Sequence, residues 1–442
     1  MSQVKEQVVQ SIPRYEYDLS HFSFQKGAIG SLMFHDVIPV IAGDVVQIDW
    51  RGIFRLAPLR HQLSVDAVVD LCVFYQPYRH VYNRGGATDW TDFIKQGTDE
   101  SVTFGTYTSP AGNIGCLGLR VNTSTAVPRW MFITPVDIWN NYFRDPSDTS
   151  GILADNYFTA PGTDVYNNGL PCCHLKDFAT TGVATTTDTS DYRLPLTDTN
   201  TTVDLINFQS LKGRLQTEQA RDWFAISRYR DVLDYIWGSK ANSDVDSIPT
   251  LIGRSTTWLS GIDVDGTDDA TLGDFVSKAQ QLCRVRVPQR YMPEHGTIWL
   301  SSLIRFPYIK DNQTHYLATK SQPTYKELAG DPGLVANEPP FQLNNTDIFI
   351  GASSVSLGYH PYAQWYRTHP NIVNMDYATI GGNPFISSDP TSRTDAIYVL
   401  PADYDAAFQT SQYKHWNSQS RIDVWKSSYL PDPTRSIFAG SR

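Results

Sequence analysis

The fold is decided by one stretch, Val65-Asp66-Ala67-Val68-Val69-Asp70-Leu71-Cys72-Val73-Phe74-Tyr75. Its odd-numbered positions are apolar throughout. Its even-numbered positions begin with the acidic Asp66 and end with the apolar Cys72 and Phe74. A repeat of two residues indicates a β-strand. A strand that becomes apolar on both sides is typical of burial on both faces. The stretch therefore predicts a strand that begins half-buried and ends inside a layered β-fold.

Further strands are predicted on both sides of this stretch. Residues 39–56, 297–306 and 421–429 are rich in β-branched and aromatic side chains. Strands near the two ends of the chain favour a β-sandwich whose ends return to pair, as in a jelly roll.

Helices are expected between these strands. Thr217 can cap a helix with apolar positions up to Ile236 that ends at Gly238, and a second helix is expected at 203–215. A third helix-like stretch covers 271–283.

Composition indicates a protein with few charges and many aromatic rings. The 442 residues include 19% charged and 12% aromatic side chains. Interface cores favour Tyr, Trp and Phe and avoid Lys and Glu, but an aromatic-rich globular core explains the same numbers. The length fits two or three average domains, or one domain with long insertions.

The sequence predicts neither a membrane span nor a disulfide framework. It contains no apolar run near twenty residues, and the stretch that begins at Met1 has no apolar signal core. Five cysteines in a chain of this length favour synthesis in a reducing cytoplasm.

The formal net charge of −10 bears on nucleic-acid binding. Non-specific affinity for DNA comes mainly from Lys and Arg, which displace counterions from phosphate. Many copies of this chain around DNA would repel it on average. A container for DNA would therefore need a locally basic inner face or a basic partner.

Twelve short motifs, in one order along almost the whole chain, resemble the major capsid protein of phiX174-like microviruses, which are small icosahedral single-stranded DNA phages. They are Asp18-Leu19-Ser20-His21, Arg305-Phe306-Pro307, Gln364-Trp365-Tyr366-Arg367, Trp416-Asn417-Ser418-Gln419, and residues 39–44, 55–60, 79–82, 140–143, 172–176, 254–268, 287–296 and 328–332. No single motif is diagnostic, but twelve in the same order are highly specific.

The resemblance implies a structural protein and not an enzyme. It implies a mainly β, eight-stranded antiparallel jelly roll in a single capsid domain over 1–442. Long insertions are expected at roughly 83–200 and 308–395, as loops, and at 203–238, as helices. It also implies pentamers that form a T=1 shell of sixty copies in the virion, after synthesis in the bacterial host cytoplasm.

The same resemblance implies a set of partners. They are a pentameric spike protein, internal and external scaffolding proteins, a small basic DNA-packaging protein and the circular single-stranded DNA genome. A host cell-surface glycan is a further candidate partner, and neither a cofactor nor membrane insertion is expected.

Several fragments resemble metal or catalytic sites but match them incompletely. Asp263, Asp265, Asp268 and Asp269 are closely spaced, yet Gly266 is fourth where a calcium loop needs glycine sixth, and position twelve is Asp274 in place of glutamate. Turn and capping roles are therefore favoured, and whether a metal binds stays open.

Two other fragments have structural interpretations. Cys172-Cys173-His174 has no second ligand pair for zinc, so the thiols are expected to be small buried groups. Glu294-His295 has no nucleophile assigned to it and is expected to make structural hydrogen bonds. No catalytic residue is predicted.

Candidate DNA-facing residues lie in two basic clusters. Arg284, Arg286 and Arg290 have no acids between them, and they rank first as a phosphate-facing or subunit-facing patch. Lys212 and Arg214 flank the 217–238 helix, where acids at helical spacing favour a salt-bridged surface instead.

Two other classes of protein share parts of this pattern. A secreted carbohydrate-active β-sandwich, either enzyme or binding module, predicts a signal peptide and a carboxylate pair. A calcium-dependent binding module predicts a completed metal loop.

Overall fold

The computed structural model describes residues 14–60, 63, 65–82, 84, 90–95, 103–109, 115–118, 125–145, 148, 151–159, 170–183, 247–265, 275–335, 338, 340–350, 352, 354–373, 385–386, 390, 392–409 and 414–430. Its strands are β1 (Tyr15–Asp18), β2 (His21–Gly27), β3 (Ser31–Val40), β4 (Val45–Leu56), β5 (Ala67–Pro77), β6 (Thr106–Ser109), β7 (Thr125–Pro128), β8 (Leu170–Pro171), β9 (Thr250–Leu259), β10 (Gly261–Asp265), β11 (Phe275–Tyr291), β12 (Gly296–Arg305), β13 (Phe341–Asn344), β14 (Ser356–His360) and β15 (Trp416–Ser428). Its α-helices are α1 (Tyr78–Tyr82), α2 (Trp90–Lys95), α3 (Trp130–Tyr142), α7 (Tyr316–Thr319), α8 (Tyr325–Ala329), α9 (Pro332–Val335) and α10 (Arg393–Ile397).

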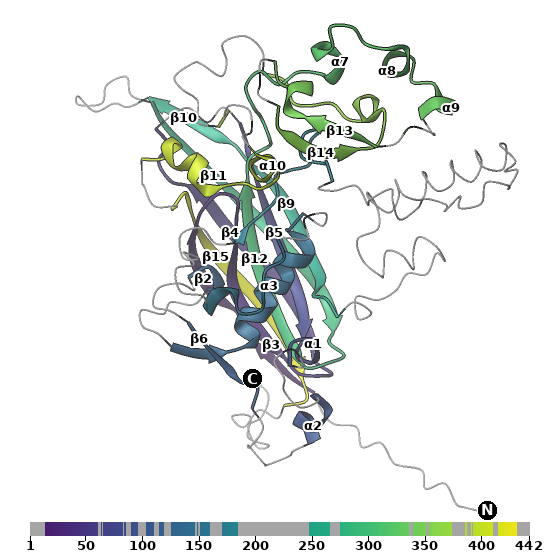
Figure 1. Cartoon of the computed structure of the whole chain (residues 1–442). Coiled ribbons are helices and arrows are strands. Elements are labelled where there is room, and N and C mark those ends of the chain that lie inside the picture. Colours follow the sequence, from purple (N-terminus) through teal and green to yellow (C-terminus); the bar gives the residue numbers. More distant parts are fainter. Residues whose placement is uncertain are drawn as a thin grey trace, which may run out of the picture.

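Two antiparallel sheets form the body of the molecule (Figure 1). The six-stranded sheet has the order β1-β15-β4-β11-β10, with β2 also paired to β15, and the five-stranded sheet has the order β8-β3-β12-β5-β9. Two packed antiparallel sheets are the architecture of a jelly roll. The predicted mainly β fold is confirmed, and the ends of the chain pair as expected, since β1 and β2 both bind β15.

The core lies between the two sheets and is built by alternation along the strands. His35 of β3 packs against Trp50 of β4 and Trp416 of β15, with ring centroids 4.9 and 6.2 Å apart. Trp50, Phe54 and Trp416 are fully or almost fully buried. One side of β3, β4 and β15 therefore faces the partner sheet.

A third layer covers the other side of the five-stranded sheet. Helix α3 packs there, with Tyr142 4.9 Å from Phe74 and Trp130 6.2 Å from Trp299, centroid to centroid. All residues of β5 are buried as a result. The predicted burial on both faces is therefore seen along the whole strand, whereas the predicted half-buried start is not, since only Val65 and Asp66, which precede β5, are partly or fully exposed.

One predicted helix is wrong. The described part of 271–283 belongs to strand β11, which pairs with β4 from Gln280 to Tyr291. Ala279, Cys283, Val285 and Val287 are buried in alternation. Pairing and burial on one face override the helix propensity of Lys278, Ala279 and Gln280. The helices expected at 203–215 and 217–238 lie outside the described residues.

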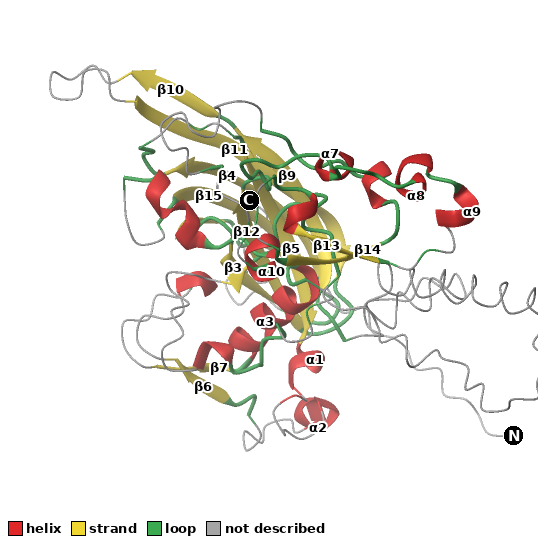
Figure 2. Cartoon of the chain, turned by 45° about the horizontal axis from the view of Figure 1, so that its top comes forward, coloured by secondary structure: helices red, strands yellow, loops and turns green. Residues whose placement is uncertain are grey.

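A smaller lobe is formed by residues within 308–373, where loops were expected. It contains α7, α8, α9 and the β13–β14 pair, and it has its own apolar cluster. Trp365 stacks on Tyr316 in this cluster at 4.4 Å between ring centroids. Figure 2 shows the lobe and the β10–β11 hairpin extending from the body in different directions.

Candidate assembly and nucleic-acid interface

Strand β11 directs Arg284 and Arg286 to the exposed side of the six-stranded sheet. Successive side chains of a strand point to opposite faces. Val285 and Val287 are buried in the core, so the arginines on either side of Val285 point away from it. Two of the three leading DNA-facing candidates therefore share one face.

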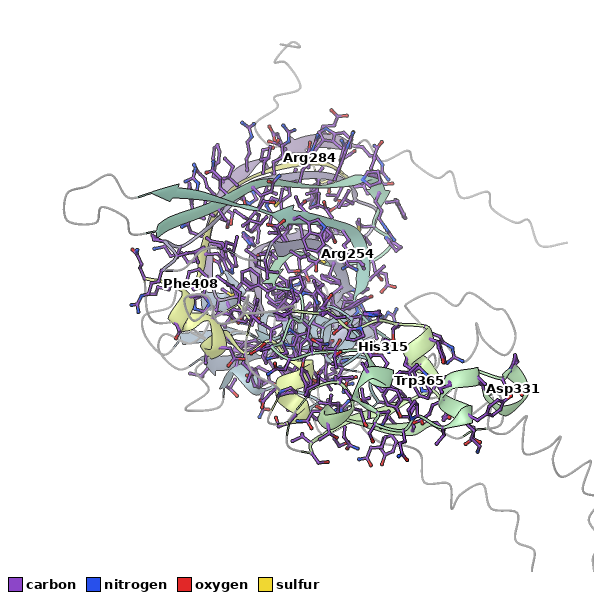
Figure 3. The ribbon with its side chains drawn as sticks, turned by 90° about the horizontal axis from the view of Figure 1, so that it is seen from above. Arg254, Arg284, His315, Asp331, Trp365 and Phe408 are labelled. Carbon is purple, nitrogen blue, oxygen red and sulfur yellow. The ribbon has the colours of Figure 1, made fainter. Side chains whose placement is uncertain are left out.

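Neighbouring strands extend this face, because the printed pairings place outward side chains in rows across β2, β15, β4 and β11. The rows are Lys26, Asn417, Arg55 and Gln280; then Phe24, Gln419, Ile53 and Leu282; then Phe22, Arg421, Arg51 and Arg284; then Asp423, Asp49 and Arg286. We call this set the basic face. Figure 3 labels Arg284 at this outer side of the molecule.

The basic face has the opposite charge to the chain as a whole. It holds six basic and two acidic side chains, whereas the whole chain has a formal net charge of −10. Arg421, Arg51 and Arg284 lie side by side in one row. Like charges directly opposite on a sheet are destabilising, so this row needs the acids beside it or an external anion.

Asp49 partly neutralises that row. Its two carboxylate oxygens accept from Arg284 Nε at 2.8 Å and Arg284 Nη2 at 2.6 Å. Arg51 Nη2 donates to the same carboxylate at 2.7 Å. These hydrogen bonds, the one from Arg284 first, lower the pKa of Asp49 to about 2. The charge of Arg284 is therefore shared with Asp49.

Three other cations of the basic face are not neutralised by a described neighbouring acid. Lys26, Arg55 and Arg286 are exposed and form no ion pair with any residue that the structure describes. Their charges are the ones most available to an external anion.

Apolar side chains are exposed among these cations. Phe22, Phe24 and Leu282 are 62%, 68% and 62% exposed. Arg421 lies over the Phe22 ring, 5.8 Å from its centroid. The basic face therefore combines exposed apolar and basic side chains.

The other predicted DNA-facing residues lie elsewhere. Arg290 is exposed but follows a register shift after Val287 and pairs with Val46, so it is not in the rows above. Lys212 and Arg214 lie outside the described residues. The sequence interpretation missed Arg51, Arg55 and Arg421, although their outward positions follow from the alternation in β4 and β15.

The fragments that resembled catalytic or zinc sites have structural surroundings. Glu294 pairs with Arg79 at 3.0 Å, and His295 Nδ1 accepts from Ala42 N at 3.4 Å, so the expected structural hydrogen bonds are confirmed. Cys172 and His174 are buried, and the five cysteines are free. Among the described residues no group of His, Cys, Asp and Glu is arranged for a metal.

The calcium-like loop is only partly within the described residues. Asp263 and Asp265 belong to β10, whereas Asp268, Asp269 and Asp274 lie outside the described residues. No described helix is long and apolar enough to span a membrane.

A two-sheet β-fold with an exposed face of cations and aromatic rings is consistent with a structural class of protein. Comparison with known proteins agrees. The family described as "Capsid protein (F protein)" matches residues 6–191 and 180–438, and this chain belongs to that family. It is a virion capsid protein, not an enzyme, and nothing supports the carbohydrate-active alternative.

Curated relatives match over nearly the full length. Capsid protein F of Escherichia phage alpha3 is 37% identical over 437 residues, which is 97% of this chain and 98% of the relative. Capsid protein F of Escherichia phage G4 is 36% identical over 429 residues, and that of Enterobacteria phage phiK is 36% identical over 437 residues, with the same coverage.

Proposed function

We propose that this chain, as one capsid domain over 1–442, forms pentamers that close into a T=1 shell of sixty copies around a circular single-stranded DNA genome. The family membership and the two-sheet fold support this proposal. Obligate subunit interfaces bury about 2,000–5,000 Å², and closed symmetry lets many modest contacts add up.

We propose further that the basic face is turned toward the genome. The single observation that carries this is its excess of cations beside exposed Phe22 and Phe24, in a chain with a net charge of −10. Single-stranded DNA is held by positive surfaces that track the backbone and by aromatic rings on which bases stack. Arg286 and Arg55 are the strongest candidates for phosphate contacts, and Arg284 is weaker because Asp49 binds it.

The double variant Arg55→Gln with Arg286→Gln tests this orientation. The affinity for a single-stranded oligonucleotide, measured by fluorescence anisotropy over a series of salt concentrations, should fall. The slope of log K against log salt should decrease by about 1.4, because each phosphate contact to a single strand contributes about 0.7.

A matched control is Lys326→Gln in the lobe, whose lysine pairs with Glu338. It removes a surface cation away from the basic face and should leave the slope unchanged. Equal slopes for the double variant and the wild type would refute a genome-facing role for this surface.

We propose the implied partners on the same basis: the spike protein, the internal and external scaffolding proteins, the small basic packaging protein and, outside, a host glycan. The overall negative charge supports a basic packaged partner, because the chain has a net charge of −10 even with the cations of the basic face counted. Co-sedimentation of the chain with each purified partner would test them individually.

Trp258 supplies a prediction about assembly. It lies on β9, the outermost strand of the five-stranded sheet, and its side chain is 55% exposed. Large exposed aromatic residues on an edge strand are suited to a subunit contact. Trp258→Ala should therefore reduce the yield of pentamers or particles in sedimentation velocity, while the melting temperature changes little. Unchanged assembly would exclude this residue from the interface.

A further inference from the structure

We propose that a cavity on the outer side of the five-stranded sheet binds a phosphate group. The cavity has a volume of about 620 Å³ and lies where the end of α3, residues 172–176 and strands β5, β9 and β12 meet. It is separate from the basic face: Figure 3 shows Arg254 of the cavity between Arg284 and the lobe that carries His315 and Trp365.

The cavity is lined by an excess of cations. Arg144, Lys176, Arg254 and Arg305 all contribute to its wall. Asp70 is the acid within this group: it is buried and binds Arg254 at 3.1 Å and also Arg305. The nearby carboxylate of Asp145 pairs at 2.7 Å with Arg393, outside the wall. Asp70 thus neutralises part of the charge of Arg254 and Arg305, whereas Arg144 and Lys176 form no ion pair with a carboxylate that the structure describes.

Three buried donor or acceptor atoms of the wall lack a partner among the described residues. They are Nε of Arg144, Nε of Arg305 and Nδ1 of His174. His174 is only 6% exposed. Buried polar atoms in native proteins almost always have a partner, and leaving one unpaired is costly. These atoms are themselves out of reach of solvent, so a ligand in the cavity would contact the accessible parts of the side chains that line it.

The chemistry of the wall favours phosphate over other ligands. Clustered guanidinium and ammonium groups repel metal cations, whereas the planar fork of Arg matches the oxygens of phosphate. Arg305 is held in place by Asp70 and by the Cys173 carbonyl, which accepts from its Nη1 at 2.9 Å. The cavity volume falls within the range of small-molecule sites. Both a free phosphomonoester and the phosphate of a nucleotide chain therefore fit the chemistry.

Arg144→Gln is the decisive variant. Among described residues, the Arg144 side chain donates to the backbone carbonyls of Asp145 and Asp148 and to no carboxylate. The substitution therefore leaves no buried carboxylate without its ion-pair partner. Inorganic phosphate is titrated into the full-length protein by calorimetry at constant ionic strength set with chloride. Saturable binding by the wild type is expected, with the Kd raised at least about tenfold in Arg144→Gln, because hydrogen bonds to charged groups are strong.

Two further variants test whether a loss of phosphate binding is specific to the cavity. Lys176→Gln changes an exposed side chain and should also weaken phosphate binding, whereas Arg55→Gln on the basic face should not. An absence of saturable phosphate binding by the wild type would overturn the proposal, as would equal affinities for wild type, Arg144→Gln and Lys176→Gln.

Competition distinguishes the two sources of phosphate. Displacement of inorganic phosphate by deoxycytidine monophosphate but not by an oligonucleotide without terminal phosphate supports a free phosphomonoester. Displacement by that oligonucleotide, lost in Arg144→Gln and kept in Arg55→Gln, supports a nucleic-acid backbone. Because Arg55 belongs only to the basic face, failure here is separable from failure of the genome-facing proposal.

Discussion

Trp299→Ala should lower the free energy of unfolding by about 3–5 kcal/mol, the range for truncating a large aromatic residue in a core. Trp299 is completely buried on β12, on the side that α3 covers. Its ring packs edge-on against Phe34 at 5.3 Å and against Trp130 of α3 at 6.2 Å, centroid to centroid. Its Nε1 donates to Thr297 Oγ1 at 2.9 Å. The variant therefore opens a cavity where the sheet meets its helical cover.

Chemical denaturation followed by tryptophan fluorescence and by circular dichroism measures this loss. Trp258→Ala is the matched control, since it removes the same side chain from an exposed position. Substitutions at exposed positions usually change stability by less than about 0.5 kcal/mol. Similar losses for the two variants would contradict the assignment of Trp299 to the buried layer.

Lowering the pH from about 7.5 to about 5 should reduce the free energy of unfolding by roughly 3–5 kcal/mol. Burial lowers the pKa of His35 to about 3, that of His174 to about 3 and that of His360 to about 4. In the unfolded chain these imidazoles titrate near pH 6.5. Below that pH the unfolded state binds protons that the folded state does not, so stability falls as the pH falls toward the folded pKa values.

Asp137 opposes this trend, as do Asp177 and Asp403, because burial also raises the pKa of each of those two carboxyl groups. Burial raises the pKa of Asp137 to about 6, against the lowering effect of Arg84. Protonation of Asp137 between pH 6 and its unfolded pKa favours the folded state by about 1 kcal/mol at pH 5. Each histidine contributes a loss of about 2 kcal/mol at the same pH if it stays neutral, so the histidines dominate.

Urea denaturation midpoints at the two pH values, with His35→Gln as the test variant, measure the effect. His35 Nε2 lies 2.8 Å from Ser302 Oγ, a contact that a glutamine amide can replace. The variant should lose about a third of the histidine contribution to the pH dependence. Ile304→Val, a core change without a titrating group, should shift both midpoints equally. A pH dependence unchanged in His35→Gln would contradict a neutral buried imidazole.

The strands show how much of the fold the local sequence predicts. The alternation in 65–75, the β-rich runs 297–306 and 421–429, and the pairing of the chain ends were predicted and are confirmed by β5, β12 and β15. Each depends on a period of two, which a strand imposes on its own residues wherever it lies. The helix expected at 271–283 failed because its residues have helix-forming side chains that pairing with β4 overrides.

Helix α3 was missed for a related reason. Trp130-Met131-Phe132-Ile133 is continuously apolar, and Pro135 lies inside the helix, so the segment lacks an amphipathic pattern. A helix buried on most sides shows no polar stripe from which its period can be read.

The candidate sites also combine features that the sequence predicts with features that only the tertiary structure shows. The sequence by itself determined the mainly β fold and the kinship with a capsid family, because these follow from local periodicity and motif order. It also singled out Arg284 and Arg286 as a basic run, but not the side of the sheet on which they lie. Only the tertiary structure decided that Arg51, Arg55 and Arg421 lie beside them and that Arg144, Lys176, Arg254 and Arg305 line one cavity. Those residues are brought together by pairing and packing between distant segments, and such contacts leave no periodic signal in a single chain.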